Sequence, residues 1–109
     1  MEYIKAKQQI EEKYKTREIS LDCLEIETNE MLDDYNFCFV ALKDYKGYAL
    51  LTDYANNLQE IELNENKIIE ICKKHGIIFN NYHLECLYNS NQDIENYINC
   101  LKELASNNK

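Results

Sequence analysis

The sequence predicts an α+β domain in which an antiparallel, or mixed, sheet of about five strands carries helices mainly on one face. Two observations predict this class. Apolar residues alternate with a period of two in several short segments, as in strands, and recur every three or four residues in others, as in helices. The expected order is α-β-β-β-α-β-β-α, organised around residues 45–63, where a strand turns back on itself.

The first element is expected to be a helix over residues 2–17. This segment is rich in Lys, Glu, Gln and Ala and contains no helix breaker. Tyr3, Ala6, Ile10 and Tyr14 recur at spacings of three and four and form one narrow apolar stripe. Residues 18–109 are expected to form the α+β core, and the 109 residues together make one domain.

Three strands are expected between residues 19 and 52. The apolar positions of 19–28 change parity between Cys23 and Leu24, which predicts one strand with a bulge at that point. Segment 36–42 is apolar on both parities, which is typical of a central strand. A turn over 44–47 then leads to a strand over 48–52, which closes a hairpin.

The second half contains two helices and a second hairpin. After a turn over 53–57, segment 58–63 fits neither period clearly. Asn64 is a good N-cap for a helix over 65–75, and Gly76 is the expected C′ residue. Strands are expected over 77–79 and 82–88. Ser90 or Asn91 caps the last helix, whose apolar stripe consists of Ile94, Tyr97, Ile98, Leu101, Leu104 and Ala105.

A zinc site is the most tempting chemistry, because Cys72, His75, His83 and Cys86 are all residue types that ligate zinc. Residues 83 and 86 differ by an odd number on a predicted strand, so their side chains point to opposite faces. We therefore interpret the cysteines as core thiols and the histidines as surface imidazoles, and expect no metal and no cofactor.

No arrangement of residues indicates catalysis. The sequence has neither a glycine-rich phosphate-binding loop nor a GxSxG motif, since its two glycines are too few for either, and no His is placed to activate a cysteine. Paired carboxylates such as Asp33 and Asp34 are inevitable among twenty acidic residues. We expect the protein not to be an enzyme.

The compartment is expected to be the cytoplasm. Residues 1–17 are charged throughout, unlike a signal peptide, and no apolar run approaches the ~20 residues of a membrane span. The five cysteines are an odd number without a CxxC pair, which favours reduced thiols. Abundant Asn, Lys, Ile and Tyr have A/T-rich codons, which suggests a low-GC bacterium or one of its phages.

The charge distribution is the strongest functional signal. A formal net charge of −8 argues against direct nucleic-acid binding and fits a basic protein partner. Residues 18–42 contain no Lys or Arg. The candidate partner-binding residues are Asp22, Glu25, Glu27, Glu30, Asp33, Asp34, Tyr45, Tyr48, Asp53 and Tyr54. The alternative is a solvated outer face that prevents edge-to-edge aggregation, with tyrosines that pack in the core and rim.

From Leu24 onward the chain resembles an uncharacterised family of bacteria and prophages, the domain of unknown function eighteen twenty-eight. Leu51, Thr52 and Asp53 match its Leu-Thr-Asp-Asp-Gly hairpin end, whereas Tyr54 and Ala55 replace the Asp-Gly. The later helix, hairpin and closing helix follow the layout of the family, and an N-terminal helix is common there. The resemblance implies an α+β fold and a mobile-element setting, without an established activity or catalytic residues.

We expect a non-enzymatic interaction protein, encoded by a phage or prophage, that binds and inhibits a basic host or defence protein. Inhibition of a CRISPR nuclease is the most specific form of this expectation. An antitoxin or accessory subunit of a larger complex is one alternative. A small-ligand binder or enzyme that uses the Thr52–Asp53 turn is another. No membrane contact is expected, and a homodimer is compatible with the sequence.

Overall fold

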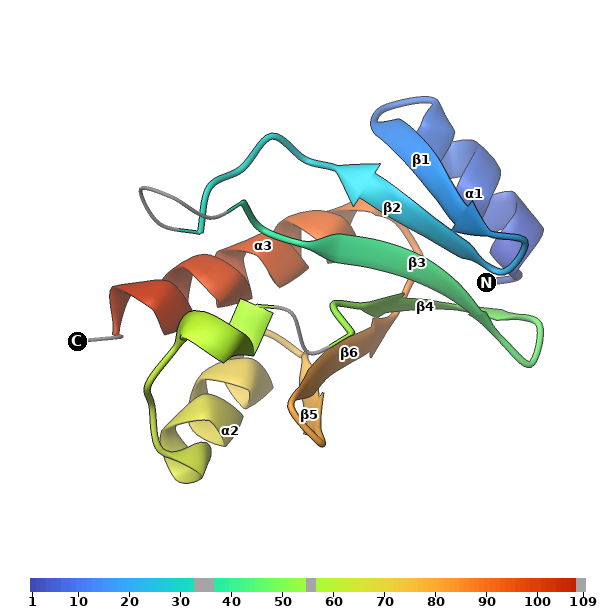
Figure 1. Ribbon diagram of the computed structural model, residues 1–109. Coiled ribbons are helices and arrows are strands. Elements are labelled where there is room, and N and C mark those ends of the chain that lie inside the picture. Colours follow the sequence, from blue (N-terminus) through green and yellow to red (C-terminus); the bar gives the residue numbers. More distant parts are fainter. Residues whose placement is uncertain (33–36, 55–56, 108–109) are drawn as a thin grey trace.

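The computed structural model describes residues 1–32, 37–54 and 57–107, except the side chains of residues 59 and 60. Within these residues, three α-helices, one short 3-10 helix and a six-stranded antiparallel sheet form the fold (Figure 1). The elements are α1 (Tyr3–Glu11), β1 (Lys15–Ser20), β2 (Cys23–Glu27), β3 (Val40–Tyr45), β4 (Tyr48–Thr52), the 3-10 helix η1 (Asn57–Glu60), α2 (Glu65–Lys74), β5 (Ile78–Asn80), β6 (His83–Leu87) and α3 (Asn91–Ser106). The α+β class is confirmed, with six strands rather than five.

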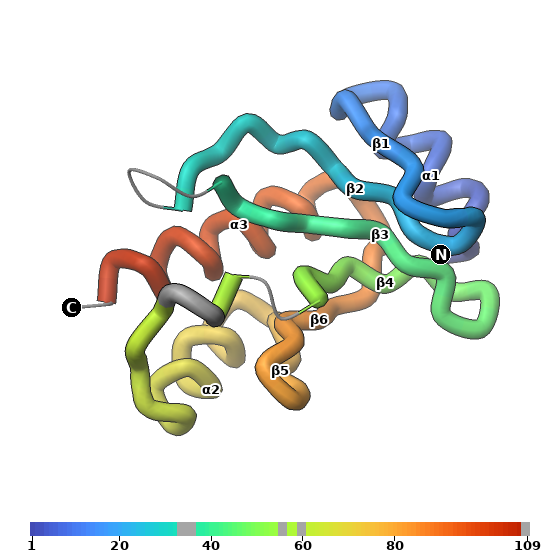
Figure 2. Tube along the Cα trace, in the orientation of Figure 1, coloured from blue at the N-terminus to red at the C-terminus, as the bar shows by residue number. Residues whose placement is uncertain are grey.

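The sheet has the order β1-β2-β3-β4-β6-β5, and all its neighbours are antiparallel. In Figures 1 and 2, α1 and α3 lie on one side of this sheet. α1 contacts β3 and β4, while α2 contacts β5 and α3. Leu24, Leu42 and Leu51 point from the sheet into the core and are fully buried. Each such side chain stabilises the fold by about 1.5–3 kcal/mol.

The first helix is shorter than predicted. α1 ends at Glu11, and 15–17 belong to β1. Strand pairing overrides helix propensity here, since β1 places Lys15 opposite Glu27 and Arg17 opposite Glu25. The backbone N–H of Tyr14 bonds to the carbonyl of Ile10 and closes the helix.

The predicted bulge at Cys23–Leu24 is wrong, because a hairpin turn causes the change of parity. Leu21 and Asp22 form the turn between β1 and β2, and Leu21 is 98% exposed. The register shift lies in β1 instead, between Glu18 and Ser20. Residues 19–28 therefore form the end of one strand and the whole of the next.

The central strand predicted over 36–42 lies instead over Val40–Tyr45, as β3. β3 starts at Val40, Phe37 makes only an isolated bridge to Met31, and residue 36 lies outside the described residues. Segment 58–63 is not a strand. Leu58, which belongs to η1, and Ile61, which follows it, are both buried.

The later elements follow local signals closely. The Asn64 side chain accepts a hydrogen bond from the Lys67 N–H, and Gly76 has the positive φ of a C′ residue. Ser90 forms a capping box with Asp93 at the start of α3. The turn of the second hairpin is shifted by one residue from the prediction, to Asn81 and Tyr82, both with positive φ.

Candidate interaction surface

One face of the sheet carries none of the helices in the described residues, and we call it the open face (Figure 1). The pairing register places the following residues on it: Glu25 and Glu27 from β2, Lys43 and Tyr45 from β3, Tyr48, Leu50 and Thr52 from β4, Glu85 and Leu87 from β6, and Ile78 from β5. This face offers exposed side chains from β3, β4, β5 and β6 to a partner.

Tyr54 covers the middle of the open face. Its hydroxyl donates a hydrogen bond to Cys23 Sγ on β2, at 3.1 Å. The Lys43 ammonium lies 5.8 Å from the centre of its ring, and the His83 ring meets it edge to face. The Tyr54 side chain thus reaches from the end of β4 to Cys23 on β2 and meets side chains of β3 and β6 on the way.

The backbone of Tyr54 is in the left-handed region, with φ of 50°. This conformation costs a non-glycine residue about 1–2 kcal/mol. The hydroxyl of Thr52 accepts a hydrogen bond from the Tyr54 N–H, which helps to hold the turn. Tyr54 was predicted to bind a partner, and the structure gives it a covering role within the protein.

We expect Tyr54→Ala to destabilise the protein by about 2 kcal/mol, because it exposes the apolar surface beneath a half-buried ring. Tyr54→Phe keeps the ring and loses only a bond to a weak sulfur acceptor, so its cost stays below about 1 kcal/mol. Urea denaturation of the two variants measures both values. Equal costs would show that the ring contributes nothing as a cover.

An apolar strip occupies the β4–β6–β5 side of the open face and consists of Tyr45, Tyr48, Leu50, Leu87 and Ile78. Tyr45 lies opposite Tyr48, and Leu50 lies opposite Leu87. Leu50 is half-buried, and each of the other four side chains is at least 50% exposed. Four of them line a shallow hollow of about 360 Å³. Gathered, exposed apolar side chains mark a surface that binds another molecule.

Polar groups border the apolar strip on one side. Lys43, Asn80, His83 and Glu85 line a second hollow of about 280 Å³ beside it, together with Thr52 and Tyr54. Two residues, Asn80 and Glu85, border both hollows. An apolar centre with a polar rim is the common anatomy of a protein interface.

The predicted acidic surface is divided by local partners. Glu25 pairs with Arg17, Glu30 pairs with Lys102 at 2.9 Å, and Asp22 accepts a hydrogen bond from Ser20 at 2.7 Å. The pairing with Glu25 raises the pKa of Arg17. Arg17 on β1 and Lys102 on α3 therefore offset the charges of Glu25 and Glu30, although residues 18–42 contain no basic residue of their own. Asp33 and Asp34 lie outside the described residues.

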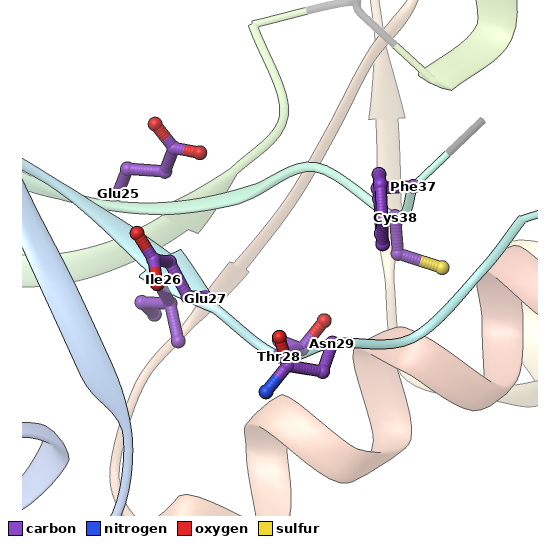
Figure 3. A pocket seen from close by; sticks show the side chains of 7 residues that line it. All are labelled: Glu25, Ile26, Glu27, Thr28, Asn29, Phe37 and Cys38. Carbon is purple, nitrogen blue, oxygen red and sulfur yellow. The ribbon is translucent and has the colours of Figure 1, made fainter.

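A hollow of about 260 Å³ lies where β2 ends (Figure 3). Glu25, Glu27 and Asn29 line one side and Phe37 the other, and Phe37 is 67% exposed. Within the described part of the chain Glu27 forms no ion pair, and it lies opposite Lys15 in the sheet. A carboxylate near an exposed aromatic ring suits a Lys or Arg side chain from a basic partner.

Asp53 does not lie on the surface. It is fully buried, and its carboxylate accepts hydrogen bonds from the N–H of Leu84 at 3.1 Å, the N–H of Asn57 at 3.3 Å and the Asn57 side chain at 3.2 Å. The carboxylate joins the end of β4 to β6. Asp53 is therefore a structural residue of the turn rather than a contact for a partner.

The tyrosines and the acidic residues do not form one site. Tyr45 and Tyr48 lie at the β3–β4 turn, whereas Glu27 lies opposite the start of β3. Sequence reasoning missed Leu50, Leu87 and Ile78, which complete the apolar strip. Their positions in predicted strands were visible, but the strand order that unites them was not.

The cysteine and histidine residues considered for zinc have other surroundings. Cys72 is buried in the core, and His75 Nε2 lies 2.9 Å from Glu103 Oε1. Across 1–32, 37–54 and 57–107, no three His, Cys, Asp or Glu side chains gather to hold a metal ion. Across the same residues, no helix has the length and apolar character needed to span a bilayer.

Comparison of the chain with family models, curated proteins and solved structures gave no match. The resemblance to the domain of unknown function eighteen twenty-eight therefore stays a prediction.

Proposed function

We propose that this protein is a protein-binding module whose docking surface is the apolar strip of the open face. The observation that carries the proposal is the exposure of Ile78 (64%), Tyr48 (60%), Leu87 (56%) and Tyr45 (50%) in one patch. Tyr combines apolar area with a hydroxyl group and is enriched at interfaces. Covering such side chains with a partner supplies the main free energy of association.

The partner is a basic protein in this proposal. A net charge of −8 attracts a positively charged partner over long range and raises the association rate. The hollow beside Glu27 and Phe37 offers a place for a Lys or Arg side chain of that partner. Charge then guides the encounter, and the apolar strip provides most of the affinity.

The finer form of the proposal makes the partner a host or defence protein, inhibited because the bound module covers its working surface. Small size and acidity support this form, as does the abundance of Asn, Lys, Ile and Tyr, whose A/T-rich codons suggest a phage or a low-GC bacterium. A CRISPR nuclease is the most specific candidate target.

A tagged pull-down from a low-GC bacterial lysate, eluted with rising salt and read by mass spectrometry, tests this proposal. We expect one stoichiometric basic protein, part of which elutes only when high salt is combined with mild detergent, since salt screens charges but not apolar contacts. An acidic partner would contradict the charge-guided encounter, and complete release by salt alone would contradict the assignment of the apolar strip as the main anchor.

A further inference from the structure

Two buried cysteines face each other between α2 and α3. Cys72 Sγ and Cys100 Sγ are 3.9 Å apart, and each residue is 1% exposed. The last turn of α2 is also held to α3 by charged groups, because Lys74 and His75 both bond to Glu103. The two sulfur atoms therefore meet inside a helix–helix contact that is fixed at its edge.

The distance between the sulfur atoms is compatible with a covalent bond after a small movement. A disulfide needs an S–S separation of about 2.05 Å, and rotation about χ1 moves a sulfur atom by more than the difference. The two residues are 28 positions apart in the chain. A bond between them would close a loop that contains β5 and β6.

The two thiols differ in reactivity. The S–H of Cys100 donates to Cys72 Sγ, which lowers the pKa of Cys72 and raises that of Cys100. Burial raises the pKa of Cys38 to about 11 and that of Cys86 to about 12. Because the thiolate is the nucleophile, Cys72 is the most reactive of these four cysteines once an oxidant reaches it.

We propose that Cys72 and Cys100 form an oxidisable dithiol that closes to an internal disulfide with hydrogen peroxide. The Cys72 thiolate attacks the peroxide and breaks its O–O bond, which gives a sulfenic acid and hydroxide. The Cys100 sulfur then attacks the sulfenic sulfur and expels its oxygen, and two protons leave with it as water. In total, two thiols and one peroxide become one disulfide and two waters.

Burial makes the reaction slow, because peroxide enters only when the α2–α3 contact opens. The product fastens α2 to α3 and constrains the unfolded chain, so the oxidised protein melts at a higher temperature. The segment from α2 through Gly76 leads directly into β5, which carries Ile78 of the apolar strip. Oxidation thus makes that edge of the open face more rigid, independently of what the face binds.

The test is incubation of the native, reduced protein with hydrogen peroxide, followed by intact mass and disulfide mapping. We expect the loss of two hydrogens, a peptide that links Cys72 to Cys100, a melting temperature raised by several degrees, and reversal by dithiothreitol. Cys86→Ala is the matched control, since it removes a neighbouring thiol and leaves the pair intact. Cys100→Ala is expected to stop Cys72 at a sulfenic or sulfinic acid.

Three results would overturn the proposal, and all are visible in the wild-type protein without any variant. The first is a disulfide between other cysteines, and the second is oxidation of Cys72 and Cys100 to separate acids. The third is formation of the link only in denaturant, because that bond would not arise from the native contact.

Discussion

Asp53→Ala is expected to destabilise the protein by about 3–5 kcal/mol, enough to remove most of the stability of a small domain. The substitution leaves three donors without their acceptor in the interior, namely the backbone N–H of Leu84 and the N–H and side-chain amide of Asn57. Each buried donor left unsatisfied costs about 1–3 kcal/mol. Urea denaturation followed by circular dichroism measures the loss.

Asp53→Asn and Asp22→Ala are the controls for this prediction. Asn keeps one acceptor oxygen at the buried position, so we expect about half the loss. Asp22 is exposed in the β1–β2 turn, and its removal should cost less than about 1 kcal/mol. If Asp53→Ala costs no more than Asp22→Ala, the carboxylate does not join β4 to β6 as described.

Alkaline pH is expected to destabilise the folded protein, because burial keeps several of its thiols and phenols protonated. Burial raises the pKa of Cys86 to about 12, that of Tyr3 to about 12, and that of Tyr97 well above its ordinary value. The folded state therefore holds these protons more tightly than the unfolded state. The resulting stability is complete below the ordinary values of about 9 for thiols and 10 for phenols, and is lost as the pH rises through the folded-state pKa values.

Each such group removes roughly 1.4 kcal/mol per pH unit once the unfolded chain has released its proton. The loss should begin near pH 9 with the thiols and become steeper above pH 10 with the phenols. Unfolding free energies measured from about pH 7 to pH 11, alongside tyrosinate absorbance, test this. Cys86→Ala should flatten the first part of the curve. A constant free energy up to pH 11 would contradict the burial of these groups.

Local signals predicted the second half of the chain better than the first. Asn64, Gly76 and the Ser90–Asp93 box define helix ends through hydrogen bonds within a few residues, so their pattern is visible in sequence. β1 has no such signal. Lys15 and Arg17 are good helix formers, and they belong to a strand because β1 pairs with β2, where Glu27 and Glu25 lie opposite them.

The candidate surface depends even more on contacts between residues that are distant in the sequence. Tyr45 and Tyr48 were predicted as contact residues because they belong to the stretch 45–63 around which the chain is organised. Leu50, Leu87 and Ile78 join them only because β6 inserts between β4 and β5, and sequence reasoning did not give that strand order. Nor could the acidic count reveal that Arg17 and Lys102 pair with Glu25 and Glu30, because pairing depends on tertiary contacts.

The most direct test of docking through the apolar strip is the affinity of the captured partner for two matched double variants. Ile78→Ser with Leu87→Ser removes two side chains of the strip, 64% and 56% exposed. Ile4→Ser with Ile69→Ser removes similar side chains on α1 and α2, 68% and 45% exposed and away from the open face.

Both variants should fold, because all four residues are exposed. We expect the strip variant to bind roughly a hundredfold more weakly and the control variant to bind within about threefold of the wild type. Equal affinity of the two variants, or loss of binding in the control alone, would contradict the account.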